Sequence, residues 1–276
     1  MTTDAEGVRI WHQSFTVLDD VGGYRDALGD HFAKVARPGT TVDLHGMAPG
    51  TYPTDYPGTH IRYLHLQHLL REQFVRAAVT AEEQGYDAFF IATIPDVGFE
   101  EIRTLVDIPV IAYGQASLLV GATLGSRVGI VNFIDDLRPQ LRRNAETYGL
   151  GGLLGPIVSI DLPFGGILDG YRDAGPVVDA FTAAARRAIE AGAEVVVPGE
   201  GPLNILLARN GVSSVDDVPV VDSLAAGVKL CEARVDLRRS SGLGPSRRGL
   251  FHARPPAELI AAAQTFAGEW RASGHA

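Results

Sequence analysis

The 276-residue sequence predicts an α/β fold built from parallel sheets, and two observations support this prediction. First, short runs rich in β-branched residues alternate with amphipathic stretches of helical period, the pattern of strands that helices cover on both faces. Second, the chain contains an internal repeat of helix end, glycine, acidic residue, apolar strand and polar turn residue. The repeat predicts two parallel-sheet α/β lobes related by pseudo-two-fold symmetry, with an active site in the interlobe cleft.

The apolar runs predict the positions of the strands and helices. We expect strands at residues 8–15, 40–46, 87–92, 109–114, 127–133, 156–162, 194–198 and 219–222. The clearest helices are expected at residues 63–84, 137–148, 177–191 and 224–235. Residues 47–60 and 237–250 interrupt this alternation and are interpreted as solvated loops. The alternatives are that the first covers a site and that the second is a mobile connector or contacts an anion.

The repeat singles out two positions for chemistry. Gly85 precedes Thr93 by eight positions, and Gly192 precedes Glu200 by the same eight. Each polar residue follows an apolar strand, and groups that do chemistry gather just beyond the carboxyl ends of parallel strands. If the two halves face each other, Thr93 and Glu200 flank the cleft from opposite sides. In the alternative, a tandem pair of lobes arranged side by side, they would not.

Composition excludes several classes of partner. The net charge is −9 and no long run carries a single sign, so we expect a small-molecule partner and no nucleic acid. The sequence shows no leader pattern and no apolar stretch of membrane-spanning length, so we expect no membrane partner and a cytoplasmic location. The single cysteine, Cys231, lies on an apolar helical stripe and is interpreted as a core residue.

The two halves of the repeat resemble a known family. Residues 87–131, 191–207 and 217–233 are similar to the two halves of hydantoin racemase and its aspartate/glutamate racemase relatives. The SRRGLFHARPP segment at residues 246–256 resembles that family's tail. The resemblance implies one lobe from residues 1–118 with 225–276 and a second from residues 119–224. It also implies an enzyme without a cofactor and a homo-oligomer.

The family has a cysteine at each of the two repeated positions, one on each face of the substrate's acidic carbon. The resemblance places Thr93 and Glu200 at those positions as the catalytic residues. A thiol with a pKa of about 8.5 exchanges protons at neutral pH, whereas an unassisted hydroxyl is far too weak an acid. Glu200, with an ordinary pKa of about 4.3, is a competent base once burial raises that value. We therefore expect one-sided chemistry, with Thr93 orienting the substrate or holding an oxyanion.

Further residues near the strand ends are candidates for substrate binding. Each of them could instead be a turn or capping residue, and Asp96 in particular could cap a helix that begins near Phe99. Asp222 is expected to cap the last long helix in the same way. The substrate-binding candidates are Gln13, Ser14, Asp96, Gln115, Ser117, Asn132, Gly199 and Gly201.

Other motifs carry weaker signals. His60, His65 and His68 are close in sequence, but no carboxylate stands at ligand spacing beside them, so we expect no metal site. His12 ends the first strand and either faces the cleft or is a buried core residue. The glycine-rich run at residues 149–155 follows a helix and lacks the spacing of a dinucleotide loop, so no nucleotide cofactor is implied.

These interpretations predict a cofactor-independent isomerase or lyase. It would transfer a proton at the acidic carbon of a small carboxylate or cyclic amide, with Glu200 in place of the usual thiol pair. Tautomerisation, decarboxylation and elimination all fit a single proton carrier. Two alternatives remain open: a small-molecule binding protein that has lost catalysis, and a hydrolase in which Glu200 activates water.

Overall fold

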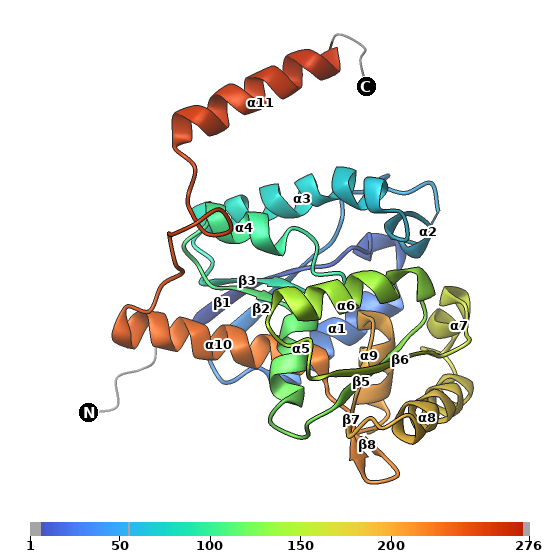
Figure 1. The fold of residues 1–276 in the computed structure, drawn as a ribbon. Coiled ribbons are helices and arrows are strands. Elements are labelled where there is room, and N and C mark those ends of the chain that lie inside the picture. Colours follow the sequence, from blue (N-terminus) through green and yellow to red (C-terminus); the bar gives the residue numbers. More distant parts are fainter. Residues whose placement is uncertain (1–6, 55, 273–276) are drawn as a thin grey trace.

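The computed structural model describes residues 7–54 and 56–272, which form two lobes, each around its own parallel sheet (Figure 1). The first sheet has the strand order β2-β1-β3-β4 and the second has the order β6-β5-β7. In both sheets the first strand of the lobe lies between its second and third strands, and all pairings are parallel. The predicted two-lobe α/β fold is therefore confirmed. The strands are β1 Val8–Gln13, β2 Thr40–His45, β3 Ala88–Ile91, β4 Val110–Ala112, β5 Val128–Asn132, β6 Leu154–Ser159 and β7 Val195–Pro198.

Helices cover both faces of the first sheet. Helices α3 and α4 pack on one face, and α10 packs on the other, with α1 against β2. Helix α11 stands apart from the two sheets, beyond α3 and α4 in Figure 1. The helices associated with this lobe are α1 Gly22–Val35, α2 Gly58–Ile61, α3 Leu64–Glu83, α4 Phe99–Leu105, α5 Tyr113–Gly121, α10 Ser223–Ser241 and α11 Ala257–Ala272, with the 3-10 helix η1 Leu18–Asp20.

The second sheet is covered by fewer elements. Helix α8 packs against β5, β6 and β7, while α5 packs against β7 and α6 against β6. The helices of this lobe are α6 Arg138–Thr147, α7 Phe164–Asp169, α8 Gly175–Glu190 and α9 Gly201–Arg209, with the 3-10 helix η2 Asp135–Leu137. A short hairpin of β8 (Ser214–Val215) and β9 (Val218–Pro219) follows α9.

One apolar core passes from the first lobe into the second. Buried residues of β5 and β7, among them Val128 and Val195, belong to the same cluster as the first-lobe strands. A second cluster, centred on Phe181 of α8, fills the other face of the second sheet. The buried Tyr113 at the start of α5 donates a hydrogen bond to the Pro198 carbonyl at the end of β7 (2.7 Å). The shared core and this bond hold the carboxyl ends of the two sheets beside each other.

The repeated glycines end two equivalent helices. Gly85 and Gly192 have φ values of +73° and +95°, the left-handed region that glycine adopts without strain. After Gly85, the amide of Tyr86 donates to the Ala81 carbonyl at 3.0 Å, and after Gly192 the amide of Ala193 donates to the Ala188 carbonyl at 2.9 Å. Both helices thus close with the same hydrogen bond, as in a Schellman motif, before the chain enters β3 or β7.

Two predicted strands and two predicted loops need correction. The strand expected at 109–114 ends at Ala112, because the next residue already begins α5. The strand expected at 219–222 is reduced to a parallel bridge between Val220 and Val196. Asp216 and Asp217 both have positive φ and form the two-residue turn of the β8-β9 hairpin, which takes up the start of that segment.

The two segments expected to be solvated loops, 47–60 and 237–250, are partly helical, since α2 begins at Gly58 and α10 runs to Ser241. Specific contacts hold both segments. In the first, the Tyr52 hydroxyl donates to the Phe15 carbonyl at 2.9 Å. In the second, Arg247 donates to the carbonyls of Arg103 and Val106 at the end of α4. Each segment therefore lies against the first lobe through side chains that composition alone did not mark as anchoring.

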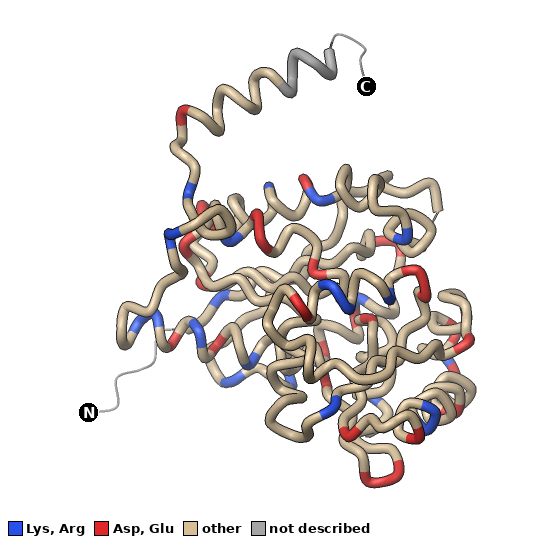
Figure 2. Tube along the Cα trace, in the orientation of Figure 1, with Lys and Arg blue, Asp and Glu red and all other residues tan. Residues whose placement is uncertain are grey.

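Charged residues of both signs are interspersed along the described chain (Figure 2). Ion pairs such as Arg37–Asp236 and Arg186–Asp216 join them in the first and second lobes respectively. Among the described residues, no helix combines the length and apolarity required to cross a bilayer.

Candidate functional site

A pocket of about 50 Å³ lies where the carboxyl ends of the two sheets meet. It contains both Thr93, which follows β3, and Glu200, which follows β7, so residues from both lobes line it. Four of the sequence candidates meet here: Ser14, Thr93, Glu200 and Gly201. The remaining lining residues are Phe15, Thr16, Tyr24, Tyr56, Pro57, Gly58, Ile61, Ala92, Phe133, Ile134, Phe164 and Pro202.

Among the described residues that line this pocket, Glu200 is the one with a carboxyl group. It precedes α9 in extended conformation, at the N-cap position, but its side chain does not cap the helix. Instead its carboxyl oxygens accept the Phe133 amide beyond β5, at 3.2 and 3.3 Å. The side chain is 7% exposed, and burial raises the pKa of Glu200 to about 8 even though the Phe133 and Ile134 amides favour its charged form. Glu200 is therefore mostly protonated at neutral pH and becomes a base just above it.

Thr93 lies in a turn that the first lobe presents to the same pocket. Its carbonyl accepts the Asp96 amide at 3.0 Å, which closes the turn, and its side chain is 9% exposed. A threonine hydroxyl can donate or accept a hydrogen bond but does not ionise in the accessible pH range. At the two repeated positions the pocket therefore has one titratable carboxyl group, from Glu200, and one neutral hydroxyl, from Thr93.

Aromatic side chains form much of the pocket wall, and the sequence did not single them out. Tyr56 of the segment 47–60 stacks on Phe164 of α7, with ring centroids 4.6 Å apart and planes at 17°. The buried Tyr24 of α1 approaches so closely that a Cβ on Gly201 would lie 2.4 Å from its hydroxyl. Burial raises the pKa of Tyr24, and a hydrogen bond with Ser14 opposes that shift. The first segment thus covers the pocket, as the alternative interpretation proposed.

Three further candidates lie behind the pocket rather than in its wall. Gln13 donates to the Gly46 carbonyl at 2.9 Å and ties β1 to the residue that follows β2. Asn132, which is fully buried, donates to the Ile134 carbonyl at 2.8 Å. The Gly199 amide donates to the Val131 carbonyl at 2.7 Å, so it is not free to donate to a substrate. These residues support the strand ends, and none of them lines the pocket with Glu200.

The remaining candidates lie away from Glu200. The side chain of Asp96 does not cap α4, because the N-cap residue is Gly98 and the carboxylate binds the start of α5 instead. The Ser117 hydroxyl donates to the Tyr113 carbonyl within α5, at 2.7 Å. Gln115 lines a different surface hollow, between α4, α5 and α10. The Asp222 prediction is confirmed, since its side chain accepts the Ala225 amide at 3.0 Å and caps α10.

Burial places His12 and Cys231 in the core rather than in the site. His12 packs against the rings of Phe32 and Phe90, and burial lowers its pKa to about 3, so it is neutral and outside the pocket. Cys231 is fully buried in the core, as expected. In the part of the chain that the structure describes, no three His, Cys, Asp or Glu side chains are arranged to hold a metal ion.

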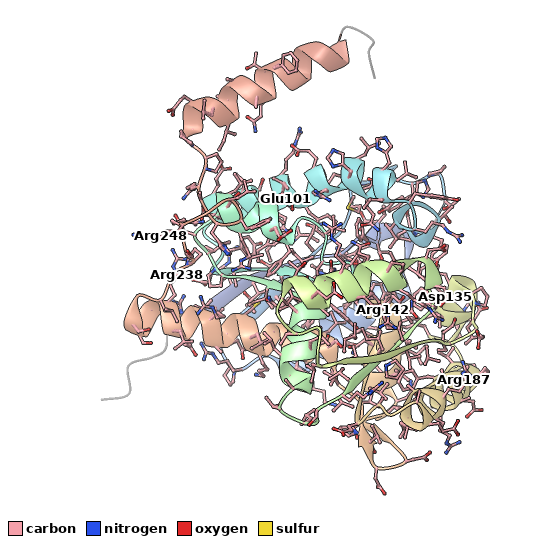
Figure 3. All side chains as sticks on the ribbon, in the orientation of Figure 1. Glu101, Asp135, Arg142, Arg187, Arg238 and Arg248 are labelled. Atoms are coloured by element: carbon pink, nitrogen blue, oxygen red, sulfur yellow. The ribbon has the colours of Figure 1, made fainter. Side chains whose placement is uncertain are left out.

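A larger groove of about 370 Å³ runs between α3, α4 and α6. In Figure 3 the labelled Glu101 marks α4 on one side and the labelled Arg142 marks α6 on the other. Asp96 and Tyr148 line this groove, whereas Thr93 and Glu200 do not. The groove and the smaller pocket therefore lie on two sides of the turn that begins at Thr93.

Comparisons with known proteins agree with this architecture. A 27% identical hydantoin racemase from Pseudomonas sp. (strain NS671) aligns over 219 residues, 77% of this chain and 81% of the relative. One from Paenarthrobacter aurescens is also 27% identical, over 77% of this chain and 86% of its own. The solved allantoin racemase from Klebsiella pneumoniae superposes with a TM-score of 0.75 at 25% identity, covering 91% of this chain and 94% of that one.

The family model for Asp/Glu/hydantoin racemase matches residues 57–231, which is more than half of the chain. That span contains both repeated strands and both residues that follow them. The chain therefore belongs to the Asp/Glu/hydantoin racemase family and is an enzyme of the racemase kind.

Proposed function

We propose that the protein is a cofactor-independent enzyme that transfers a proton at the acidic carbon of a small cyclic amide, with Glu200 as the proton carrier. The observation that carries this proposal is the buried Glu200 carboxyl group in the interlobe pocket, with its pKa raised to about 8. A general base works best when its pKa lies near the working pH. The relatives named hydantoin racemase and allantoin racemase supply the substrate class.

The proton moves in two balanced steps. Charged Glu200 takes the proton from the ring carbon next to a carbonyl, and the C–H electron pair becomes the π bond of an enolate. The now neutral Glu200 then returns a proton to that carbon, which restores the C–H bond and the charged carboxylate. The Gly199 amide is already bonded to the Val131 carbonyl, and the Asn204 amide to the Glu200 carbonyl. Since Pro202 has no N–H, the Gly201 amide at the start of α9 is the backbone donor for the enolate oxygen.

Among the described residues that line the pocket, no second carboxyl group, histidine or cysteine accompanies Glu200. Thr93 lines the pocket from the first lobe, and in this proposal its hydroxyl orients the substrate or holds the oxyanion. Proton return therefore comes mainly from the face that lost the proton. Exchange with solvent is accordingly faster than inversion at the carbon.

Substrate entry requires the pocket to open. A volume of about 50 Å³ has room for only a few water molecules and is too small for a substituted five-membered ring. The stacked Tyr56 and Phe164 join the covering segment to α7, so separating these rings is the smallest movement that admits a substrate.

The test is deuterium incorporation from D2O into allantoin and a panel of 5-substituted hydantoins, followed by NMR. We expect the wild-type protein to label the ring carbon above the spontaneous rate and Glu200→Gln to lose at least about 100-fold of that rate. Glu194→Gln is the matched control, because Glu194 lies just before the other end of β7, where its carboxylate accepts the Ser126 amide. The control should label the substrate at the wild-type rate.

Two results would contradict the proposal. Equal labelling by Glu200→Gln and wild type would remove Glu200 from the reaction. A panel member that binds tightly without acquiring deuterium would favour a binding protein, whereas solvent oxygen entering a ring-opened product would indicate a hydrolase.

A further inference from the structure

The turn that carries Thr93 has an unusual backbone. Asp96 closes it by donating its amide to the Thr93 carbonyl, and Asp96 itself has a φ of +50°. Residues other than glycine rarely occupy this left-handed region, although Asp and Asn tolerate it best. Such a conformation persists where surrounding contacts hold it, so the contacts of Asp96 decide where Thr93 lies.

The buried Asp96 carboxylate accepts three hydrogen bonds. The Gly114 and Gln115 amides at the start of α5 donate to it at 2.8 and 3.1 Å. The Tyr148 hydroxyl at the end of α6 donates to the same carboxylate at 2.7 Å. Two donors belong to the connection that follows β4 in the first lobe, and the third belongs to the second lobe. Asp96 therefore joins the lobes directly beside the site pocket.

Helix α6 makes further bonds to the same turn. Asn144 donates its side-chain amide to the Pro95 carbonyl at 2.9 Å, and Gln140 donates to that carbonyl at 3.3 Å. Gln140, Asn144 and Tyr148 are spaced four residues apart, so they lie along one face of α6. Gln140 is in turn bonded to Gln67 of α3 at 2.8 Å. One face of α6 in the second lobe thus donates hydrogen bonds to both Pro95 and Asp96.

Gly114 provides independent evidence that this contact is tightly fitted. A Cβ at that position would lie 2.6 Å from the Asp96 carboxylate oxygen and 3.2 Å from the Ile94 carbonyl. A side chain there would force the turn away from α5, because the carboxylate occupies the space. The sequence position is therefore restricted to glycine by the approach of Asp96.

We propose that Asp96 is a positioning residue, which with Tyr148 latches the Thr93 turn to the second lobe and sets Thr93 against the face of the substrate opposite Glu200. The inference deepens the proposed function and rests on it for the role of Thr93. The latch itself is a property of the fold. Asp96 does not contact the substrate in the proposed reaction, since it lies outside the pocket that contains Glu200.

Removing one hydroxyl tests the latch. Tyr148→Phe deletes the bond from the second lobe and leaves the two amide bonds to Asp96 intact. Tyr86→Phe is the matched control, because Tyr86 also donates its hydroxyl to an aspartate, Asp43, at 2.7 Å, but at the outer edge of the first sheet. Hydrogen-exchange mass spectrometry of residues 93–98 reports on the turn, and exchange kinetics at the substrate carbon report on Thr93.

For Tyr148→Phe we expect amide exchange in residues 93–98 to accelerate about ten-fold. We also expect kcat for deuterium incorporation to fall about ten-fold while KM changes less than about two-fold, because misplacing a group at the reacting carbon acts on the transition state. Tyr86→Phe should leave both measurements at the wild-type level. Asp96→Asn, which keeps the tolerance for positive φ, should weaken the same contact, so its effect should not add to that of Tyr148→Phe.

The outcomes separate the latch from the proposed function. Wild-type amide exchange in the Tyr148→Phe turn overturns the latch, whatever the activity. Faster amide exchange with unchanged kcat overturns the positioning role of Asp96. If no substrate in the panel is labelled by the wild-type protein, the proposed function fails, while accelerated exchange in Tyr148→Phe alone would still support the latch.

Discussion

The ends of β3 and β7 are equivalent in the repeat but are connected differently. Thr93 is followed by a turn of several residues before α4 begins at Phe99, and that turn depends on Asp96 for its shape. Glu200 leads directly into α9, which begins at the next residue. The turn after β3 is held by hydrogen bonds from the second lobe. The residue after β7 is fixed by α9, which begins directly after it.

The two ends also differ in the chemistry that they offer. Burial raises the pKa of Glu200 to about 8, so this residue changes protonation near neutral pH. Thr93 is similarly buried but contributes a hydroxyl that does not titrate. A duplicated backbone can therefore carry an asymmetric pair of residues, with a titratable carboxyl group on the second lobe and a neutral hydroxyl on the first.

The largest expected effect comes from placing a thiol at position 93, which would give the first lobe a group that can exchange a proton. In Thr93→Cys, a thiol with an ordinary pKa of about 8.5 can deliver a proton from the face opposite Glu200. We expect the ratio of inversion to deuterium incorporation to rise by at least about ten-fold for an enantiopure hydantoin. Polarimetry and NMR on the same sample measure the two rates.

Thr93→Ser is the control for this substitution, since it keeps a hydroxyl and provides no thiol. Its ratio of inversion to incorporation should stay at the wild-type value. Equal ratios for Thr93→Cys and Thr93→Ser would show that this position does not face the reacting carbon.

The pH dependence of deuterium incorporation gives a smaller effect that also distinguishes the titrating Glu200 from the neutral Thr93. The basic form of Glu200 accumulates as pH rises through about 8, because burial raises its pKa. We expect kcat/KM for deuterium incorporation to increase about ten-fold per pH unit below that value and to level off above it. The residual rate of Glu200→Gln should lack this rise. A wild-type profile already level from pH 5 would mean that Glu200 is charged throughout.

The sequence predicted the architecture because the signals for it are local. Eight positions separate glycine from the polar residue in both halves, and both glycines end helices with the same hydrogen bond in the structure. The strand expected at 219–222 is reduced to a bridge at Val220, because Asp216 and Asp217 form the turn of a hairpin that takes Pro219 into β9.

The candidate site could be predicted only in part. Ser14, Thr93, Glu200 and Gly201 share one pocket, since each directly follows, or lies close behind, a strand. Tyr24 lies in a helix and reaches the pocket across the lobe, so no spacing in the sequence signals it. Tyr56 is the exception, because the aromatic and proline-rich composition of residues 47–60 could have favoured a covering segment over a solvated loop.

The most direct measurement follows deuterium incorporation and inversion together, for the wild-type protein and one enantiomer of a 5-substituted hydantoin in D2O. A single proton carrier predicts that incorporation runs ahead, so the starting enantiomer becomes labelled before much of its mirror image forms. Label that appears only in the inverted enantiomer would require proton carriers on both faces and would contradict the one-sided site centred on Glu200.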